Sequence, residues 1–106
     1  MKVKYKKVAD KLTLGFCGEL DHHSAEQVKN VIEDLVNKFN PKNVVFDFSE
    51  LVFMDSTGIG MLLSRYKSFN QKNVGVFVCG AKGSVDKVLK LSGIYKIFTK
   101  IEVDNG

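Results

Sequence analysis

The sequence predicts an α/β fold, in which a small mixed β-sheet is led by an N-terminal hairpin and helices pack on it. Short segments rich in Val, Ile and Phe alternate with longer segments whose apolar residues recur every three or four positions. Such alternation is typical of strand–helix–strand crossovers, which join parallel neighbours in one sheet. The first two strands are separated by a very short turn, which instead favours an antiparallel pair.

The hairpin strands are predicted at residues 3–8 and 11–16, with the turn at Ala9 and Asp10. Apolar residues alternate with other residues in the second strand, and they form its expected buried face: Leu12, Leu14 and Phe16. The first strand carries lysines at alternate positions, a pattern typical of a solvated edge strand that charge protects from further pairing: Lys2, Lys4 and Lys6.

The first helix is expected to begin with a capping box, with Ser24 as the cap and Gln27 three residues later. Its apolar residues have the three- and four-residue spacing of one helix face: Val28, Val31, Ile32, Leu35, Val36 and Phe39. Pro41 ends this helix, and residues 43–48 follow as a strand.

The second half repeats the alternation of helix and strand. The second helix has a predicted buried face made of Ile59, Leu62, Leu63, Tyr66 and Phe69. We expect a strand at residues 74–79, a short helix at 84–92 that Gly93 terminates, and a last strand at 97–103. The predicted order is strand, strand, helix, strand, helix, strand, helix, strand, within a single domain that spans residues 1–106.

The composition argues against several classes of protein. Of the 106 residues 44% are hydrophobic and 26% are charged, which is ordinary for a globular domain. The net charge of +4 comes almost entirely from dispersed lysines, and Arg65 is the only arginine, so we expect no nucleic-acid partner. The N-terminus carries no secretory signal and no apolar run is long enough to cross a bilayer, so we expect a cytoplasmic protein without a membrane partner.

The cysteines and histidines do not form a recognisable chemical motif. Cys17 and Cys79 lie in strand-like segments, and we expect reduced thiols. His22 and His23 are adjacent, and this spacing fits neither a metal site nor a Ser-His-Asp relay. We therefore expect no metal, no cofactor and no catalytic residue.

The segment DSTGIG, which leads from an apolar strand into the second helix, carries more polar residues than a helix start requires. Its spacing matches neither a P-loop, nor a dinucleotide fingerprint, nor a nucleophile elbow. A lone serine at the position of Ser56 would most simply cap the helix. Because Asp55 or Thr57 can satisfy the free amides instead, one hydroxyl of the segment is left without a structural role. Gly58 and Gly60 lack side chains, so another protein can approach closely. The residues predict a docking surface with an accessible hydroxyl at the carboxyl end of a parallel strand.

Three blocks of the chain resemble the bacterial anti-sigma factor antagonists, and most closely those that control sigma-F in sporulation. The blocks are GELDHHSAE at residues 18–26, LVFMDSTGIGMLLSRYK at 51–67 and SGIYKIF at 92–98. The resemblance covers nearly the whole chain, and it implies the STAS fold. Relatives usually continue past the last strand into a C-terminal helix, which we expect here to be short or absent.

The resemblance implies a regulatory switch that is not an enzyme. In the family, the unphosphorylated antagonist binds an anti-sigma factor that is also a serine protein kinase, and the sigma factor is released. The kinase then phosphorylates a serine that matches Ser56, and a serine phosphatase restores the binding form. Asp21 matches a residue near the phosphorylated serine, so the expected partner-binding residues are Asp21, Asp55, Ser56, Thr57, Gly58 and Gly60.

Two alternative functions stay open at this point. One is a phosphocarrier domain that passes phosphate through Cys17, Cys79 or a histidine, although neither cysteine begins a convincing anion-binding loop. The other is a STAS module that binds a nucleotide or another small ligand. A phosphoryl group found on sulfur or imidazole would favour the phosphocarrier.

Overall fold

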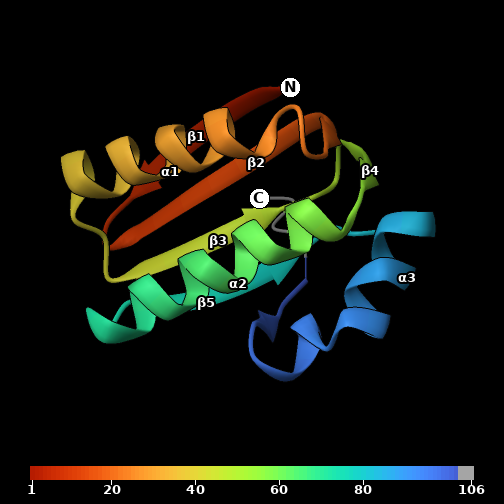
Figure 1. Cartoon of the computed structure of the whole chain (residues 1–106). Coiled ribbons are helices and arrows are strands. Elements are labelled where there is room, and N and C mark those ends of the chain that lie inside the picture. Colours follow the sequence, from red (N-terminus) through yellow and green to blue (C-terminus); the bar gives the residue numbers. More distant parts are fainter. Residues whose placement is uncertain (103–106) are drawn as a thin grey trace.

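The computed structural model describes residues 1–102 and confirms the predicted α/β class (Figure 1). The elements follow one another as β1 (Lys2–Val8), β2 (Lys11–Leu20), α1 (Ala25–Phe39), β3 (Asn43–Asp47), β4 (Leu51–Met54), α2 (Ser56–Gln71), β5 (Gly75–Cys79), α3 (Gly83–Ser92), the 3-10 helix η1 (Ile94–Lys96) and β6 (Thr99–Lys100). Across this part of the chain, no helix is both long and apolar enough to cross a lipid bilayer.

The sheet is mixed, as predicted, with the order β1-β2-β3-β5-β6. Only the β1–β2 pair is antiparallel among the strand pairs of residues 1–102. β2 is long enough to have two parallel neighbours in succession. Its first half, from Lys11 to Gly15, pairs with β3, and its last residues, from Gly18 to Leu20, pair with β4. A register shift interrupts the β2–β4 ladder, because Gly18 pairs with Leu51 whereas Glu19 pairs with Phe53.

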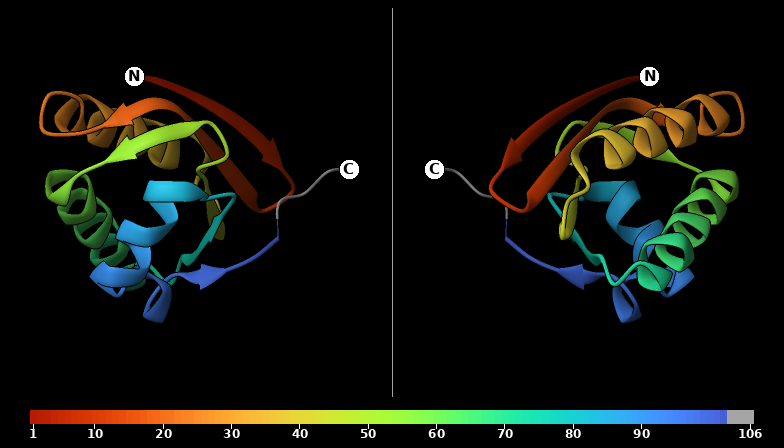
Figure 2. Two further views of the ribbon diagram at one scale, coloured as in Figure 1. Left: turned by 90° about the vertical axis from the view of Figure 1, so that its right-hand side faces the viewer. Right: turned by 90° about the vertical axis from the view of Figure 1, so that its left-hand side faces the viewer.

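The core lies between the sheet and the helices. α1, α2 and α3 lie on one side of the sheet, as Figure 2 shows from two directions. The predicted inward face of β2 is confirmed, because its three apolar residues are fully buried: Leu12, Leu14 and Phe16. Phenylalanine rings from separate elements meet beneath the helices, and their contacts join β2, β3, α2 and the segment after η1: Phe16, Phe46, Phe48, Phe69 and Phe98.

Three strands differ from the prediction. β2, expected at residues 11–16, continues to Leu20. β4 was not expected, because its four residues, LVFM, are all apolar and show no alternation of apolar and polar residues. In the structure its two central residues, Val52 and Phe53, are exposed. β4 forms because it pairs with the last residues of β2, away from the centre of the sheet. The last strand, expected at 97–103, is only the short β6, and the expected residue Val103 lies outside the described residues. No helix follows β6 up to residue 102, as predicted.

The predicted capping box of α1 is wrong. The Ser24 hydroxyl donates to the Glu19 carbonyl at 2.9 Å and accepts the Asp21 amide at 3.1 Å, so it stabilises the loop before the helix. The backbone of Ser24 already has helical dihedral angles, whereas a capping residue usually has extended ones. The side chain therefore points back into the loop.

The predicted buried face of α2 is partly wrong, because Leu63 is 41% exposed. Met61 and Arg65 are buried instead. The Arg65 guanidinium donates to the Glu33 carboxylate on α1 and, at 3.0 Å, to the Ser64 hydroxyl. α2 packs on α1 as well as on the sheet, so its buried face turns away from Leu63.

Candidate functional site

The junction between β4 and α2 is closed by a side-chain cap. Asp55 has the extended backbone of a capping residue, with φ −111° and ψ −174°. Its Oδ1 atom accepts the amide N–H of Gly58 at 3.1 Å. This bond satisfies one of the free amides of the first turn of α2, and it confirms the prediction that Asp55 can serve as the cap.

Ser56, the first residue of α2, is exposed. Among residues 1–102 its hydroxyl has no hydrogen-bond partner, and Thr57 beside it is exposed too. The N-terminus of a helix favours negative charge, because its free amide N–H groups and its dipole both point there. Ser56 is thus an accessible hydroxyl in a place that tolerates an anion.

The two glycines of the junction have different roles. Gly58 is buried, and a Cβ atom there would lie 2.8 Å from the carbonyl oxygen of Leu20 and 2.9 Å from Cγ of Met54. Its lack of a side chain serves internal packing, so the expectation that Gly58 clears the approach to Ser56 is wrong. Gly60 is exposed, and no atom lies within 4 Å of a Cβ placed there. The surface is therefore open at Gly60.

Asp21 lies at the same edge of the sheet as Asp55. Leu20 pairs with Met54, and the amide of Asp55 donates to the carbonyl of Leu20 at 3.3 Å. Asp21 and Asp55 therefore directly follow two paired residues at the carboxyl ends of neighbouring parallel strands (Figure 1). The β2–β4 pairing explains how residues from two separate sequence blocks come together.

The Asp21 carboxylate is held by its own turn. Oδ1 accepts the amide N–H groups of His23 at 2.9 Å and of Ser24 at 3.1 Å. Desolvation alone would raise the pKa of Asp21, but these hydrogen bonds to the ionised form outweigh it and lower the pKa below its ordinary value. Asp21 is consequently an oriented, ionised carboxylate at neutral pH.

α3 also contributes to the surface around Ser56, which the sequence did not predict. A shallow depression beside Ser56 is lined by apolar side chains from β4, α2 and α3: Met54, Ile59, Val88 and Leu91. Leu91 is 79% exposed, the largest fraction among the large apolar side chains of residues 1–102. The sequence does show Leu91 as an apolar residue on the outer side of a short amphipathic helix. Sequence spacing alone, however, does not place it beside Ser56.

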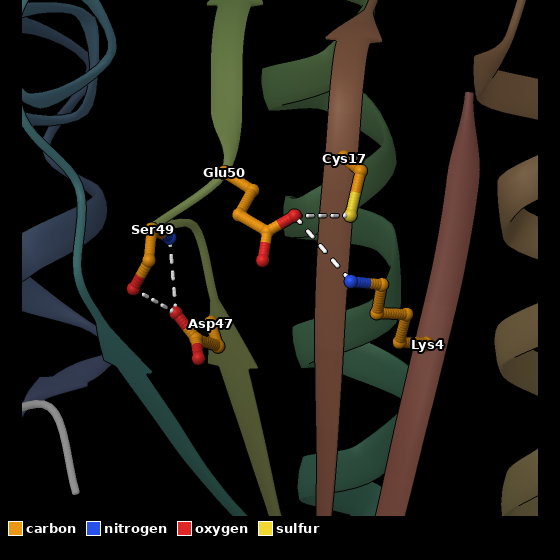
Figure 3. A network of polar contacts seen from close by, with 5 residues as sticks. All are labelled: Lys4, Cys17, Asp47, Ser49 and Glu50. Carbon is orange, nitrogen blue, oxygen red and sulfur yellow. Dashed lines mark hydrogen bonds and ion pairs between the residues drawn. The ribbon is translucent and has the colours of Figure 1, made fainter. Parts of the chain in front are cut away.

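The thiols are poor nucleophiles. Figure 3 shows that Cys17 and Lys4 both contact the Glu50 carboxylate. The Cys17 thiol donates to Oε2 of Glu50 at 3.0 Å, and this bond, together with burial, raises the pKa of Cys17. Burial raises the pKa of Cys79 to about 11. Both groups are protonated at neutral pH, which argues against phosphate transfer through sulfur. Within residues 1–102, no three His, Cys, Asp or Glu residues are grouped so that they could hold a metal.

The chain is similar to known proteins over most of its length. Residues 2–105 match the STAS domain family. An anti-sigma F factor antagonist of Paenibacillus polymyxa is 36% identical over 86 residues, which are 81% of this chain and 74% of that relative. An anti-sigma-B factor antagonist of Listeria monocytogenes is 28% identical over 98 residues, or 91% of this chain and 81% of that one.

Solved structures share the fold. The anti-sigma factor antagonist SpoIIAA in its unphosphorylated form has a TM-score of 0.82 at 24% identity, and the alignment covers 98% of this chain and 90% of that one. The phosphorylated form of SpoIIAA, a Bacillus cell fate determinant, has a TM-score of 0.74 at 23% identity, with 98% and 93% covered.

Proposed function

Because this chain belongs to the STAS domain family, and within it to the anti-sigma factor antagonists, we propose that phosphorylation of Ser56 controls its binding to an anti-sigma factor that is also a serine protein kinase. The unphosphorylated chain binds this partner and releases the sigma factor. By its similarity to the Paenibacillus polymyxa relative, the sigma factor is sigma-F, which acts in sporulation. A serine phosphatase returns the chain to its binding form, and the chain itself has no catalytic activity.

The observation that supports Ser56 as the phosphorylated residue is the cap beside it. Asp55 already accepts the amide of Gly58, so the Ser56 hydroxyl has no capping role and is exposed. A kinase can therefore phosphorylate this hydroxyl without breaking an internal hydrogen bond. Thr57 is also exposed, but the resemblance assigns the acceptor role to the residue that directly follows Asp55.

The partner surface surrounds Ser56 on several elements. Asp21 and Asp55 give it two carboxylates at adjacent strand ends. Thr57 and Gly60 form the exposed start of α2, and Gly58 supports them from beneath. The apolar depression lined by Val88 and Leu91 completes the surface beside Ser56.

The switch acts through charge at this surface. A phosphoryl group adds about −1.5 to −2 charges and three acceptor oxygens. The N-terminus of α2 stabilises this charge locally, so the fold is retained. In the complex, the same charge lies close to Asp21 and Asp55 and has to be desolvated. A cost of ~3–4 kcal/mol lowers the affinity about 100- to 1000-fold.

Binding and phosphorylation of four proteins by the cognate anti-sigma kinase test the proposal. We expect wild type and Ser56→Ala to bind with similar affinity and Ser56→Asp to bind poorly. Ser56→Ala should resist phosphorylation, whereas Thr57→Val, the matched control, should be phosphorylated like wild type. Phosphate incorporated into Ser56→Ala, or full binding by the phosphorylated wild type, would contradict the mechanism.

A further inference from the structure

β1 is an edge strand whose outer side pairs with no other strand among residues 1–102. It has seven residues, and its register with β2 runs from Lys2 opposite Cys17 to Val8 opposite Lys11. An unpaired edge of this length offers a row of backbone N–H and C=O groups that can pair with a further strand. The edge is separate from the surface around Ser56, because β4 and α2 lie on the other side of β2.

One face of the sheet is covered by no helix of the described chain (Figure 2). Lys7 is opposite the buried Leu12 and so lies on the other face. Lys4 is opposite Gly15 and Lys6 is opposite Thr13 in the β1–β2 pair, whereas the alternate residues of β2 are buried beneath the helices. Alternation along β1 therefore places one row of three lysines on the open face: Lys2, Lys4 and Lys6.

Only one of these three lysines forms an ion pair within residues 1–102. Within residues 1–102, Lys4 pairs with Glu50 at 3.6 Å, and both side chains are mostly exposed, so the pair is weak. No ion pair joins Lys2 or Lys6 to a carboxylate in the same part of the chain. A shallow hollow beside the row is lined by residues of β1, β2 and the segment from the end of β3 to the start of β4, two of them acidic: Lys4, Tyr5, Lys6, Thr13, Gly15, Phe16, Cys17, Asp47, Ser49 and Glu50. Gly15 leaves space in this hollow, because a Cβ added there would meet only Cβ of Lys4, at 3.8 Å.

We propose that the β1 edge binds an extended acidic segment of a partner protein, which adds to the sheet as a strand and places carboxylates at alternate positions opposite Lys2, Lys4 and Lys6. Side chains of adjacent strands that lie opposite each other are about 4.5–5.5 Å apart at Cβ, so each lysine reaches one carboxylate. The backbone groups of the edge supply affinity, and the spacing of the lysines supplies selectivity.

The same charges exclude a second copy of this chain as the occupant. Two β1 strands that pair with each other bring two rows of lysine together, and like charges opposite each other destabilise a sheet. Lysines on an edge thus prevent self-association, and they become attractive only for a strand of opposite charge. The inference is independent of the proposed role of Ser56.

The test uses the full chain and a peptide of about eight residues in which Glu alternates with Thr or Val, long enough to span β1. Titration calorimetry gives the affinity, and hydrogen exchange followed by NMR gives the protection of the β1 amides. We expect slower exchange of β1 amides and a loss of at least about tenfold in affinity for Lys2→Gln/Lys4→Gln/Lys6→Gln. The variant Lys67→Gln/Lys72→Gln/Lys87→Gln, which removes the same charge from exposed positions elsewhere, should bind the peptide like wild type.

Two further peptides distinguish binding by strand addition from binding by charge attraction alone. A peptide of the same composition with its glutamates consecutive, and an alternating peptide with N-methylated backbone amides, should both bind at least about tenfold more weakly. Equal binding of either one, equal binding of a single-stranded oligonucleotide, or the absence of protection in β1 would overturn the proposal. Circular dichroism of both triple variants shows that they are folded before they are compared.

Discussion

The Asp55 carboxylate accepts the amide of Gly58 at 3.1 Å, and this bond determines which side chain at the start of α2 is committed to the fold. Asp55 is the cap, and the Ser56 hydroxyl is free to be modified. Under the proposed function, stability and regulation are divided between these adjacent residues, and each can be tested separately.

Asp55→Ala should lower the free energy of unfolding by about 0.5–2 kcal/mol, because the first turn of α2 loses its side-chain acceptor. Ser56→Ala should change it by less than about 0.5 kcal/mol, because no internal hydrogen bond is lost. Urea unfolding followed by circular dichroism measures both. Equal destabilisation by the two substitutions would show that Ser56 shares the capping role.

Gly58→Ala and Gly60→Ala should have opposite effects on stability. The Cβ added at Gly58 approaches the Leu20 carbonyl oxygen to 2.8 Å, and a backbone atom cannot move away easily, so we expect a loss of about 1–3 kcal/mol. At the open position Gly60, alanine should stabilise the helix by up to about 1 kcal/mol. The midpoints of urea unfolding of the two variants measure the effects. An unchanged midpoint for Gly58→Ala would contradict the close contact.

Much of the fold was predictable, because strands and helices leave periodic patterns. The alternation in β2 predicts its buried residues correctly. The spacing in α1 correctly predicts Val28, Ile32 and Val36 as buried. The other predicted residues, Val31, Leu35 and Phe39, are only partly buried, and the buried Ala25 was not predicted. β4 leaves no such pattern, because its four residues are all apolar although two of them are exposed. It forms through its pairing with β2. Pairing between segments far apart in the sequence is invisible to local periodicity.

The candidate site was predictable only in part, for a related reason. Asp55 as the cap follows from local chemistry, and Asp21 came from the resemblance. The internal role of Gly58 depends on the carbonyl of Leu20 from a distant strand. The contribution of Leu91 depends on how α3 packs beside β4. Such contacts are set by tertiary packing rather than by sequence spacing.

The buried Arg65 should depend strongly on Glu33. Arg65 is 6% exposed, and its Nε atom has no hydrogen-bond partner among the described residues. Removing the counter-charge by Glu33→Ala should cost about 1–2 kcal/mol, less than for a fully buried pair because Glu33 is partly exposed. Arg65→Met, which removes the charge and fills the space, should change stability by less than about 1 kcal/mol. Thermal unfolding of the two variants gives the comparison, and a larger loss in Arg65→Met would contradict it.

Asp21 should contribute to stability in a pH-dependent way. Its pKa in the folded chain is lower than the ordinary value of 3.8, so its ionised form stabilises the fold above that value. The contribution is lost as the pH falls through the lowered pKa. Asp21→Asn should therefore be less stable than wild type at pH 7, and the difference should shrink below about pH 4. Urea unfolding at several pH values measures the difference in stability. A difference that stays constant down to acidic pH would contradict a stabilising role of the ionised Asp21 carboxylate.

Phosphorylation of Ser56 should leave the sheet unchanged, because the new charge lies at a helix N-terminus that favours it. In amide NMR spectra of the two forms, we expect shifts to be confined to the surroundings of Ser56: the first turn of α2, the loop at Asp21, the end of β4 and the end of α3. The Ser56→Ala protein, treated with the same kinase, is the control and should show no change. Shifts that spread through β1, β3 and β5 would mean that the switch acts by rearranging the fold. Loss of partner binding together with a purely local response would instead show that the charge acts directly at the interface.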